Sequence, residues 1–199
     1  MIRIIGSGRP VKLIVGGLHG AEGEVTEKIL FNIPFKVRAG TVVLSNLSLR
    51  SRYISTLKPQ YYETEVGRKL IHLIDTFSPE IYLELHTYRK NRISQLLDPE
   101  RERKIGVPPL VELEEGILLG SIPPQLRAKK FRRGDLCLTL EAPSDIKLHD
   151  PALKRIIQTV TLSRSGIEVL DRLRSMYPKP VRRAIKLYEE WNLGFREGI

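Results

Sequence analysis

The sequence contains little cysteine and no long apolar run, and both shortages exclude classes of protein. Its 199 residues include a single cysteine, Cys137, so neither an intramolecular disulfide nor a metal site built from cysteine pairs can form. No run of about 18 apolar residues occurs, and residues 1–5 lead directly into a turn. The sequence therefore predicts a cytoplasmic protein without a signal peptide or a membrane-spanning segment.

Acidic residues are also scarce, with 23 aspartates and glutamates against 33 lysines and arginines, a net charge of +10. Such an excess suits an anionic substrate or a nucleic-acid partner, although many basic surfaces bind neither. The densest basic stretch, residues 127–133, is interpreted first as a solvated loop. Because aromatic residues do not alternate with basic ones, stacking on bases is disfavoured, and nucleic acid is the less favoured partner.

The remaining composition is that of a globular protein, with 41% hydrophobic and 28% charged residues. Apolar β-branched runs alternate with amphipathic segments, which predicts a single α/β domain with a mostly parallel or mixed central sheet flanked by helices. Residues 1–150 are expected to form the core, and residues 151–199 to form C-terminal helices packed on it. Strands are expected at residues 11–16, 41–47, 81–87, 116–122 and 136–142. Helices are expected at residues 22–33, 62–77, 151–176 and 181–192, with an irregular segment at 88–109.

The first chemical signal follows the strand expected at residues 11–16. His19 and Glu22 lie three residues apart in a glycine-rich turn that leads into a helix. Glycines allow the backbone to bend sharply there, so both side chains can converge on one point. Zinc accepts such nitrogen and oxygen donors, and catalytic zinc sites commonly use three protein ligands with one position left open. The alternative interpretation is a glutamate that caps the helix beside an incidental surface histidine.

The second signal lies in the strand expected at residues 81–87. Because side chains alternate along a strand, Tyr82, Glu84 and His86 share one face. His86 falls at the carboxyl end of that strand, on the same rim as His19, and is the expected third metal ligand. Glu84 is expected to orient a ligand from behind.

The third signal is Glu141, at the end of the apolar strand expected at residues 136–142. A carboxylate there costs free energy unless it is solvated, paired or functional. Beside a bound metal it can act as a general base toward water and then as a general acid toward the leaving group. The alternative is an ordinary carboxylate at the rim, paired with an arginine.

These residues resemble the superfamily of zinc carboxypeptidases and aspartoacylase/succinylglutamate desuccinylase enzymes. The segment HGAE at 19–22 resembles the His-x-x-Glu pair that follows the first core strand of that superfamily. ELHT at 84–87 resembles its Asp-Leu-His-Thr strand end, with glutamate replacing aspartate, and TLE at 139–141 resembles its Thr-x-Glu strand. The resemblance extends from about residue 11 to residue 143, which leaves the C-terminal segment outside it. Within the superfamily the chain is also similar to a small archaeal family of unknown function.

The resemblance implies a substrate-binding arginine, and here the chain departs from the pattern. Relatives often carry an arginine-tyrosine pair followed by an Asn-Arg dipeptide. Arg52 and Tyr53 resemble the pair, whereas the dipeptide is replaced by Leu57-Lys58. Arg50, Arg52 and Tyr53, with Lys58 as a further cation, are therefore the candidates for binding a substrate carboxylate, because a guanidinium group matches a carboxylate in shape and charge. The alternative is a surface salt bridge or a solvated loop.

The sequence as a whole predicts a zinc-dependent amidohydrolase that acts on small N-acyl amino acids or on the C-terminus of a peptide. Zn²⁺ would bind His19, Glu22 and His86, and Glu141 would move the proton from water to the departing amine. The alternative is a non-catalytic protein of the same fold that binds a metal, nucleic acid or an acidic partner. The sequence indicates neither the substrate nor the oligomeric state.

Overall fold

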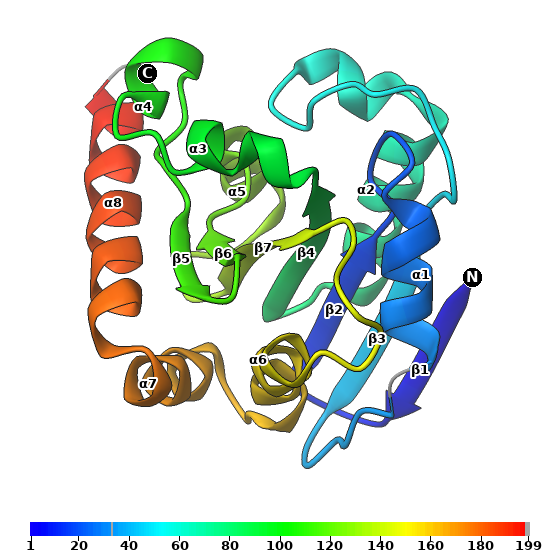
Figure 1. The fold of residues 1–199 in the computed structure, drawn as a ribbon. Coiled ribbons are helices and arrows are strands. Elements are labelled where there is room, and N and C mark those ends of the chain that lie inside the picture. The colour runs from blue at the N-terminus through cyan, green and yellow to red at the C-terminus, as the bar shows by residue number, and fades with distance from the viewer. Residues whose placement is uncertain (33, 198–199) are drawn as a thin grey trace.

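A mixed sheet with the strand order β1-β3-β2-β4-β7-β6-β5 forms the centre of the molecule (Figure 1). The computed structural model describes the backbone of residues 1–32 and 34–197 and the side chains of residues 1–32 and 34–191. The strands are β1 (Ile2–Gly6), β2 (Val11–Gly16), β3 (Thr41–Asn46), β4 (Ile81–Tyr88), β5 (Val111–Glu114), β6 (Ile117–Gly120) and β7 (Leu136–Pro143). Strands β3, β2, β4 and β7 are parallel, while antiparallel pairing adds β1 at one side and β6 and β5 at the other. The predicted α/β class with a mixed sheet is confirmed.

Helices connect the strands and follow the last of them. The α-helices are α1 (Gly23–Asn32), α2 (Glu65–Phe77), α3 (Ile93–Leu96), α4 (Arg101–Ile105), α5 (Pro124–Lys130), α6 (Pro151–Leu162), α7 (Gly166–Met176) and α8 (Pro178–Glu197). Two 3-10 helices, η1 (Pro59–Glu63) and η2 (Lys90–Arg92), precede α2 and α3. Within the described residues, no helix is both long enough and apolar enough to cross a membrane.

Side-chain alternation divides the core into two layers. Leu13 of β2 and Tyr82 of β4 pack on one face of the sheet, together with the apolar stripe of α2 that includes Leu70. Ile14 and Leu83 point to the opposite face, which α1, α6 and α7 cover. Helix α8 stands beside the edge strand β5 and also contributes to this second layer (Figure 1). The C-terminal helices therefore share a hydrophobic core with the sheet.

The strands and helices nearest the predicted motifs were located well from the sequence. Strands β2, β3, β4, β6 and β7 and helix α1 lie within a few residues of their predicted ranges. The predicted end of the first helix at residue 33, like residues 198–199, lies outside the described residues. The helix predicted at 62–77 begins later, because Thr64 caps α2 by accepting a hydrogen bond from the Gly67 amide.

Other predictions of secondary structure were wrong. The helical segment 151–176 is two helices, because Ser165 caps α7 with a hydrogen bond from the Glu168 amide. The last helix starts at Pro178 rather than 181, since proline fits the first turn of a helix. Part of the basic stretch 127–133 lies in α5 instead of a loop, and residues 88–109 contain η2, α3 and α4. Strands β1 and β5 were not predicted.

Candidate metal centre

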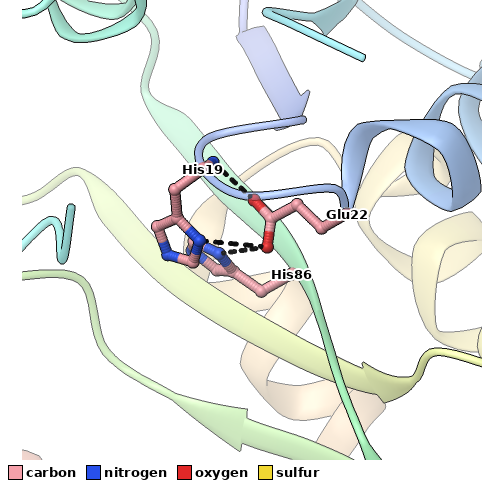
Figure 2. Close-up of side chains that lie close together, drawn as sticks. All are labelled: His19, Glu22 and His86. Carbon is pink, nitrogen blue, oxygen red and sulfur yellow. Dashed lines mark hydrogen bonds and ion pairs between the residues drawn. The ribbon is translucent and has the colours of Figure 1, made fainter. Parts of the chain in front are cut away.

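The parallel strands bring two of the predicted motifs to one rim of the sheet. His19 and Glu22 lie in the turn between β2 and α1, and His86 lies near the carboxyl end of β4, the strand beside β2. Figure 2 shows the three side chains pointing toward one another. One ligand atom from each lies within 4.8 Å of the others, and all three residues are buried or half-buried. The ligand set predicted from the sequence is therefore brought together.

The turn that carries His19 and Glu22 depends on glycine at two positions. Gly17 has a φ of +66°, and a Cβ atom there would lie 2.2 Å from the carbonyl oxygen of Ser48. At Gly23, the first residue of α1, a Cβ atom would lie 1.8 Å from the same oxygen. Backbone contact with the segment after β3 therefore holds this turn close to the rim of the sheet.

The two carboxylate oxygens of Glu22 have different partners. Oε1 accepts hydrogen bonds from the backbone amides of Leu18 and His19, at 2.7 and 3.1 Å. Oε2 lies 3.3 Å from Nδ1 of His86 and 3.5 Å from Nδ1 of His19. The backbone thus fixes the carboxylate while its second oxygen faces both imidazole rings.

His86 has a carboxylate on its other side as well. Its Nε2 lies 3.3 Å from Oε2 of Glu84, and the Tyr82 hydroxyl donates to Oε1 of Glu84 at 3.0 Å. The Thr139 hydroxyl of the neighbouring strand β7 donates to Oε2 at 3.4 Å. A carboxylate behind a ligating imidazole fixes its tautomer and orients its ring, so Glu84 occupies the place expected of it.

Burial and neighbouring charge prepare these groups to bind a cation. Burial lowers the pKa of His19, and the nearby His86 lowers it further, which favours the neutral ring whose nitrogen lone pair can bind a cation. Burial opposes the charged form of Glu22, but His86 and His19 outweigh it and lower the pKa of the carboxyl group. Burial likewise opposes protonation of His86, yet Glu22 and Glu84 together raise its pKa well above the usual range.

The donor set fits zinc in its chemistry. Two imidazoles and one carboxylate are the ligands of a common type of catalytic zinc site, in which a fourth position faces the substrate. Three carboxylates, Glu22, Glu84 and Glu141, surround His86, so a bound cation would replace the proton that this ring otherwise attracts. The residues alone do not select zinc from other divalent transition metals, which accept the same ligands.

Glu141 lies across from His86 in the register between β7 and β4. Its side chain lines the same cavity as His19 and His86. Burial raises the pKa of Glu141 to about 7, partly offset by the positive charges of His86 and Arg101. A carboxyl group with such a pKa can both accept and donate a proton near neutral pH.

The cavity has a volume of about 150 Å³ and contains a cation that the sequence analysis missed. Arg101, from α4, has the only permanent positive charge among the lining side chains that the structure describes. Its guanidinium group donates to the carbonyl oxygen of Pro108 at 2.7 Å and is attracted to Glu141. In the sequence Arg101 stands in a run of charged residues that resembles a solvated surface, so no local signal distinguishes it.

The arginines predicted to bind substrate lie elsewhere. Arg50 is exposed and pairs with Glu24 of α1, with Nε 2.5 Å from Oε1. Arg50 and Arg52 line a separate pocket of about 270 Å³ rather than the cavity that contains Glu141. Tyr53, by contrast, lines the cavity that contains Glu141, and its ring meets the ring of His19 edge-on at a centroid distance of 4.6 Å. Of the three candidates, only Tyr53 is brought to the metal centre.

Comparison with known proteins identifies the family. The chain belongs to the family described as uncharacterized proteins conserved in archaea, DUF2119, whose model matches residues 7–193. It is 36% identical over 189 residues to the uncharacterized protein MJ0501 of Methanocaldococcus jannaschii, covering 92% of this chain and 91% of the relative. The resemblance to an archaeal family of unknown function is thus confirmed.

Solved structures with a similar chain path include the cell shape determinant protein Csd4 of Helicobacter pylori. A variant of Csd4 matches with a TM-score of 0.42 and 11% identity, and the tripeptide-bound form matches with a TM-score of 0.39 and 12% identity. In both cases the match covers 89% of this chain but only 55% of the Csd4 chain. The chain therefore spans about half the length of these structures.

Proposed function

We propose that this protein is a zinc-dependent hydrolase that cleaves the amide bond of a small N-acyl amino acid or of a peptide C-terminus. The observation that carries the proposal is the convergence of His19, Glu22 and His86 on one point, with Glu141 lining the same cavity. Three ligands with an open side suit a catalytic metal better than a structural one, which is usually enclosed by four.

Zinc held by these residues would supply Lewis-acid chemistry, because it polarises a carbonyl oxygen and makes water more acidic. The chain's own groups supply the proton transfer. Glu141 accepts a proton from the attacking water and passes it to the departing amine nitrogen, for which a pKa of about 7 is well suited. Glu84 holds the His86 ring in orientation throughout.

Arg101 is the group we assign to the anionic end of the substrate. It lines the cavity, and no carboxylate of the described residues lies within ion-pair distance of it. A substrate carboxylate would add an ion pair to the hydrogen bond that the guanidinium group already donates to Pro108. This assignment replaces Arg50 and Arg52, whose side chains line the other pocket.

The alternative of a nucleic-acid-binding protein receives less support from the basic stretch at 127–133. The Arg127 guanidinium donates to the backbone carbonyls of Arg133 and Asp135, and Lys130 pairs with Asp75 of α2 at 2.7 Å. Part of the stretch therefore stabilises the fold rather than facing a partner. A steep salt dependence of nucleic-acid binding would reverse this preference.

The test begins with the metal content of untagged protein, measured by elemental analysis after zinc is supplied and the excess is removed. We expect about one zinc per chain, lost in His19→Ala and His86→Ala and retained in His72→Ala. His72 is a matched control, because it is exposed on α2. Absence of zinc from the wild type would contradict the proposal.

Hydrolysis is then assayed on a panel of N-acetylated amino acids and short peptides. Glu141→Gln is expected to retain zinc but to lower the rate about 10²- to 10⁴-fold, as loss of a general base does. Glu65→Gln is the control, since Glu65 pairs with Lys69 on the exposed side of α2. Equal rates for the wild type and Glu141→Gln would remove Glu141 from the mechanism.

A further inference from the structure

A second cavity, of about 280 Å³, adjoins the one that contains the candidate metal centre. The two cavities share wall residues from the end of β6 and from α8, namely Leu119, Gly120, Ser121, Ala184 and Tyr188. They are therefore neighbouring compartments with a common wall, and the C-terminal helix, which has no counterpart in the sequence resemblance, forms part of both.

The sheet leaves room for this second cavity because β6 ends before it reaches the first residues of β7. Strand β6 pairs with β7 only as far as Gly120, which lies opposite Thr139. The first residues of β7, 136–138, continue without that neighbour, and α7 and α8 lie beside them in its place. Residues 136–138 therefore border the second cavity, while Thr139 and Glu141, further along β7, border the first.

Aliphatic side chains form most of this second wall. They come from the start of β7, from α7 and from α8, and comprise Leu136, Leu138, Ile167, Leu170, Val181 and Ile185. Ile167, at the first turn of α7, is 74% exposed and lines this cavity from its solvent side. Four charged residues, Arg127, Arg133, Asp135 and Glu189, also line this cavity, and Arg127 already donates to two backbone carbonyls. The aliphatic part of the wall suits a hydrocarbon chain.

We infer that the second cavity binds the aliphatic acyl chain of the substrate whose amide lies at the metal centre. The inference rests on the proposed function and narrows its substrate class to N-acyl amino acids with a medium-length or long acyl group. The carboxylate of the amino acid pairs with Arg101, the amide carbonyl faces His19 and His86, and the acyl chain extends past Tyr188 toward Ile167. Volume supports this class, because 150 Å³ alone is small for a ligand site, whereas both cavities together reach the usual range of about 300–1,000 Å³.

Trp191 provides a direct measurement, because it is the one tryptophan of the chain and lines the metal cavity. Zinc-loaded wild type and Glu141→Gln are titrated with N-acylglycines from acetyl to decanoyl while tryptophan fluorescence is recorded. Burial of each added methylene is expected to tighten binding about fourfold until the cavity is full. Because affinity is measured rather than rate, binding of the acyl chain is observed separately from hydrolysis.

Two variants test where the acyl chain of the ligand lies. Ile167→Asp places a charge at the mouth of the second cavity, at a helix N-terminus where aspartate is tolerated, and Ala184→Phe fills the shared wall. Both are expected to flatten the dependence of affinity on chain length. Ile4→Asp is the matched control, because Ile4 is 56% exposed on the distant edge strand β1.

Each outcome decides one of the two proposals. Affinity that does not change with chain length in the wild type would overturn the inference, and hydrolysis of short acyl amides by the same sample would leave the hydrolase proposal standing. A chain-length dependence that Ile167→Asp and Ala184→Phe do not alter would also overturn it, because the chain would then lie elsewhere. If both variants weaken the dependence of affinity on acyl-chain length, the result supports binding of the acyl chain in the second cavity. That conclusion would hold even if the protein hydrolysed none of the compounds. In that case only the hydrolase proposal would fail.

Discussion

Nε2 of His86 lies 3.3 Å from Oε2 of Glu84, two residues earlier on the same strand. Because strand side chains alternate, the two groups share a face of β4, and the ring bridges Glu84 on one side and Glu22 on the other. Glu84 can hold Nε2 as the donor, and Nδ1, which faces Glu22, is then the nitrogen that would bind a cation in place of a proton. Glu84, which is not itself a candidate ligand, therefore also helps to prepare this site for a metal.

Glu84→Gln is accordingly expected to weaken zinc binding without removing a ligand. Loss of such a carboxylate typically lowers metal affinity by about 10- to 100-fold, because the ring is less well oriented and less basic. Competition with a chromophoric chelator measures the affinity, and Glu65→Gln, on the exposed side of α2, serves as the control. An unchanged zinc affinity in Glu84→Gln would show that Glu84 does not support His86.

Arg101→Met should raise KM for anionic substrates much more than Arg50→Met. A hydrogen-bonded charge pair is worth about 1.5–3 kcal/mol, which corresponds to roughly 10- to 100-fold in KM. Arg50 already pairs with Glu24 at the surface, so its loss should have little effect on steady-state kinetics. If Arg50→Met impaired the enzyme and Arg101→Met did not, the anionic end would lie where the sequence first suggested.

Zinc should stabilise the folded protein, because its ligands converge only there. A hundredfold excess of free zinc over the dissociation constant adds about 2.7 kcal/mol to the free energy of unfolding, or roughly 5–10 °C in Tm. Differential scanning fluorimetry with and without a chelator measures the shift. His86→Ala should show no zinc-dependent shift, and magnesium should not replace zinc, since it prefers oxygen ligands. A shift of equal size in His86→Ala would place the bound zinc elsewhere.

Lys12 is expected to make stability depend on alkaline pH. Its side chain is fully buried in β2, and Nζ donates to the carbonyl oxygens of Ala39 and Thr161 at 2.7 and 2.8 Å. Burial lowers the pKa of Lys12 to about 8, below its value near 10.5 in the unfolded chain. Between these two values the unfolded chain binds more protons, so raising the pH favours the folded state.

The measurement is urea unfolding of the wild type and Lys12→Met from pH 7 to 10. Lys12→Met removes the donor from the buried Thr161 carbonyl and the half-buried Ala39 carbonyl and should be less stable throughout. The advantage of the wild type should grow as the pH rises from about 8, because the amine loses its charge but keeps its hydrogen bonds. A difference that stays constant over this range would indicate an unshifted pKa for Lys12.

Local patterns in the sequence were sufficient for the centre of the sheet and for the candidate ligands. Apolar runs identify β2, β4 and β7, and the period of two along β4 already places Glu84 and His86 on one face. Strand β1 was not predicted because its apolar run, Ile2 to Ile5, is short and ends at once in a turn, so pairing with β3 is what makes it a strand. The short strand β5 is likewise formed by pairing with β6.

The sequence by itself determined which side chains stand at the ends of the parallel strands, because a turn and a strand end are set by neighbouring residues. Only the tertiary structure decided what surrounds them. Arg101 reaches the cavity through the packing of short helices after β4, and Tyr188 and Trp191 reach it because α8 folds back beside β5. Contacts between residues so far apart in the sequence depend on the free energy of the whole core, which cannot be predicted from a local pattern of residues.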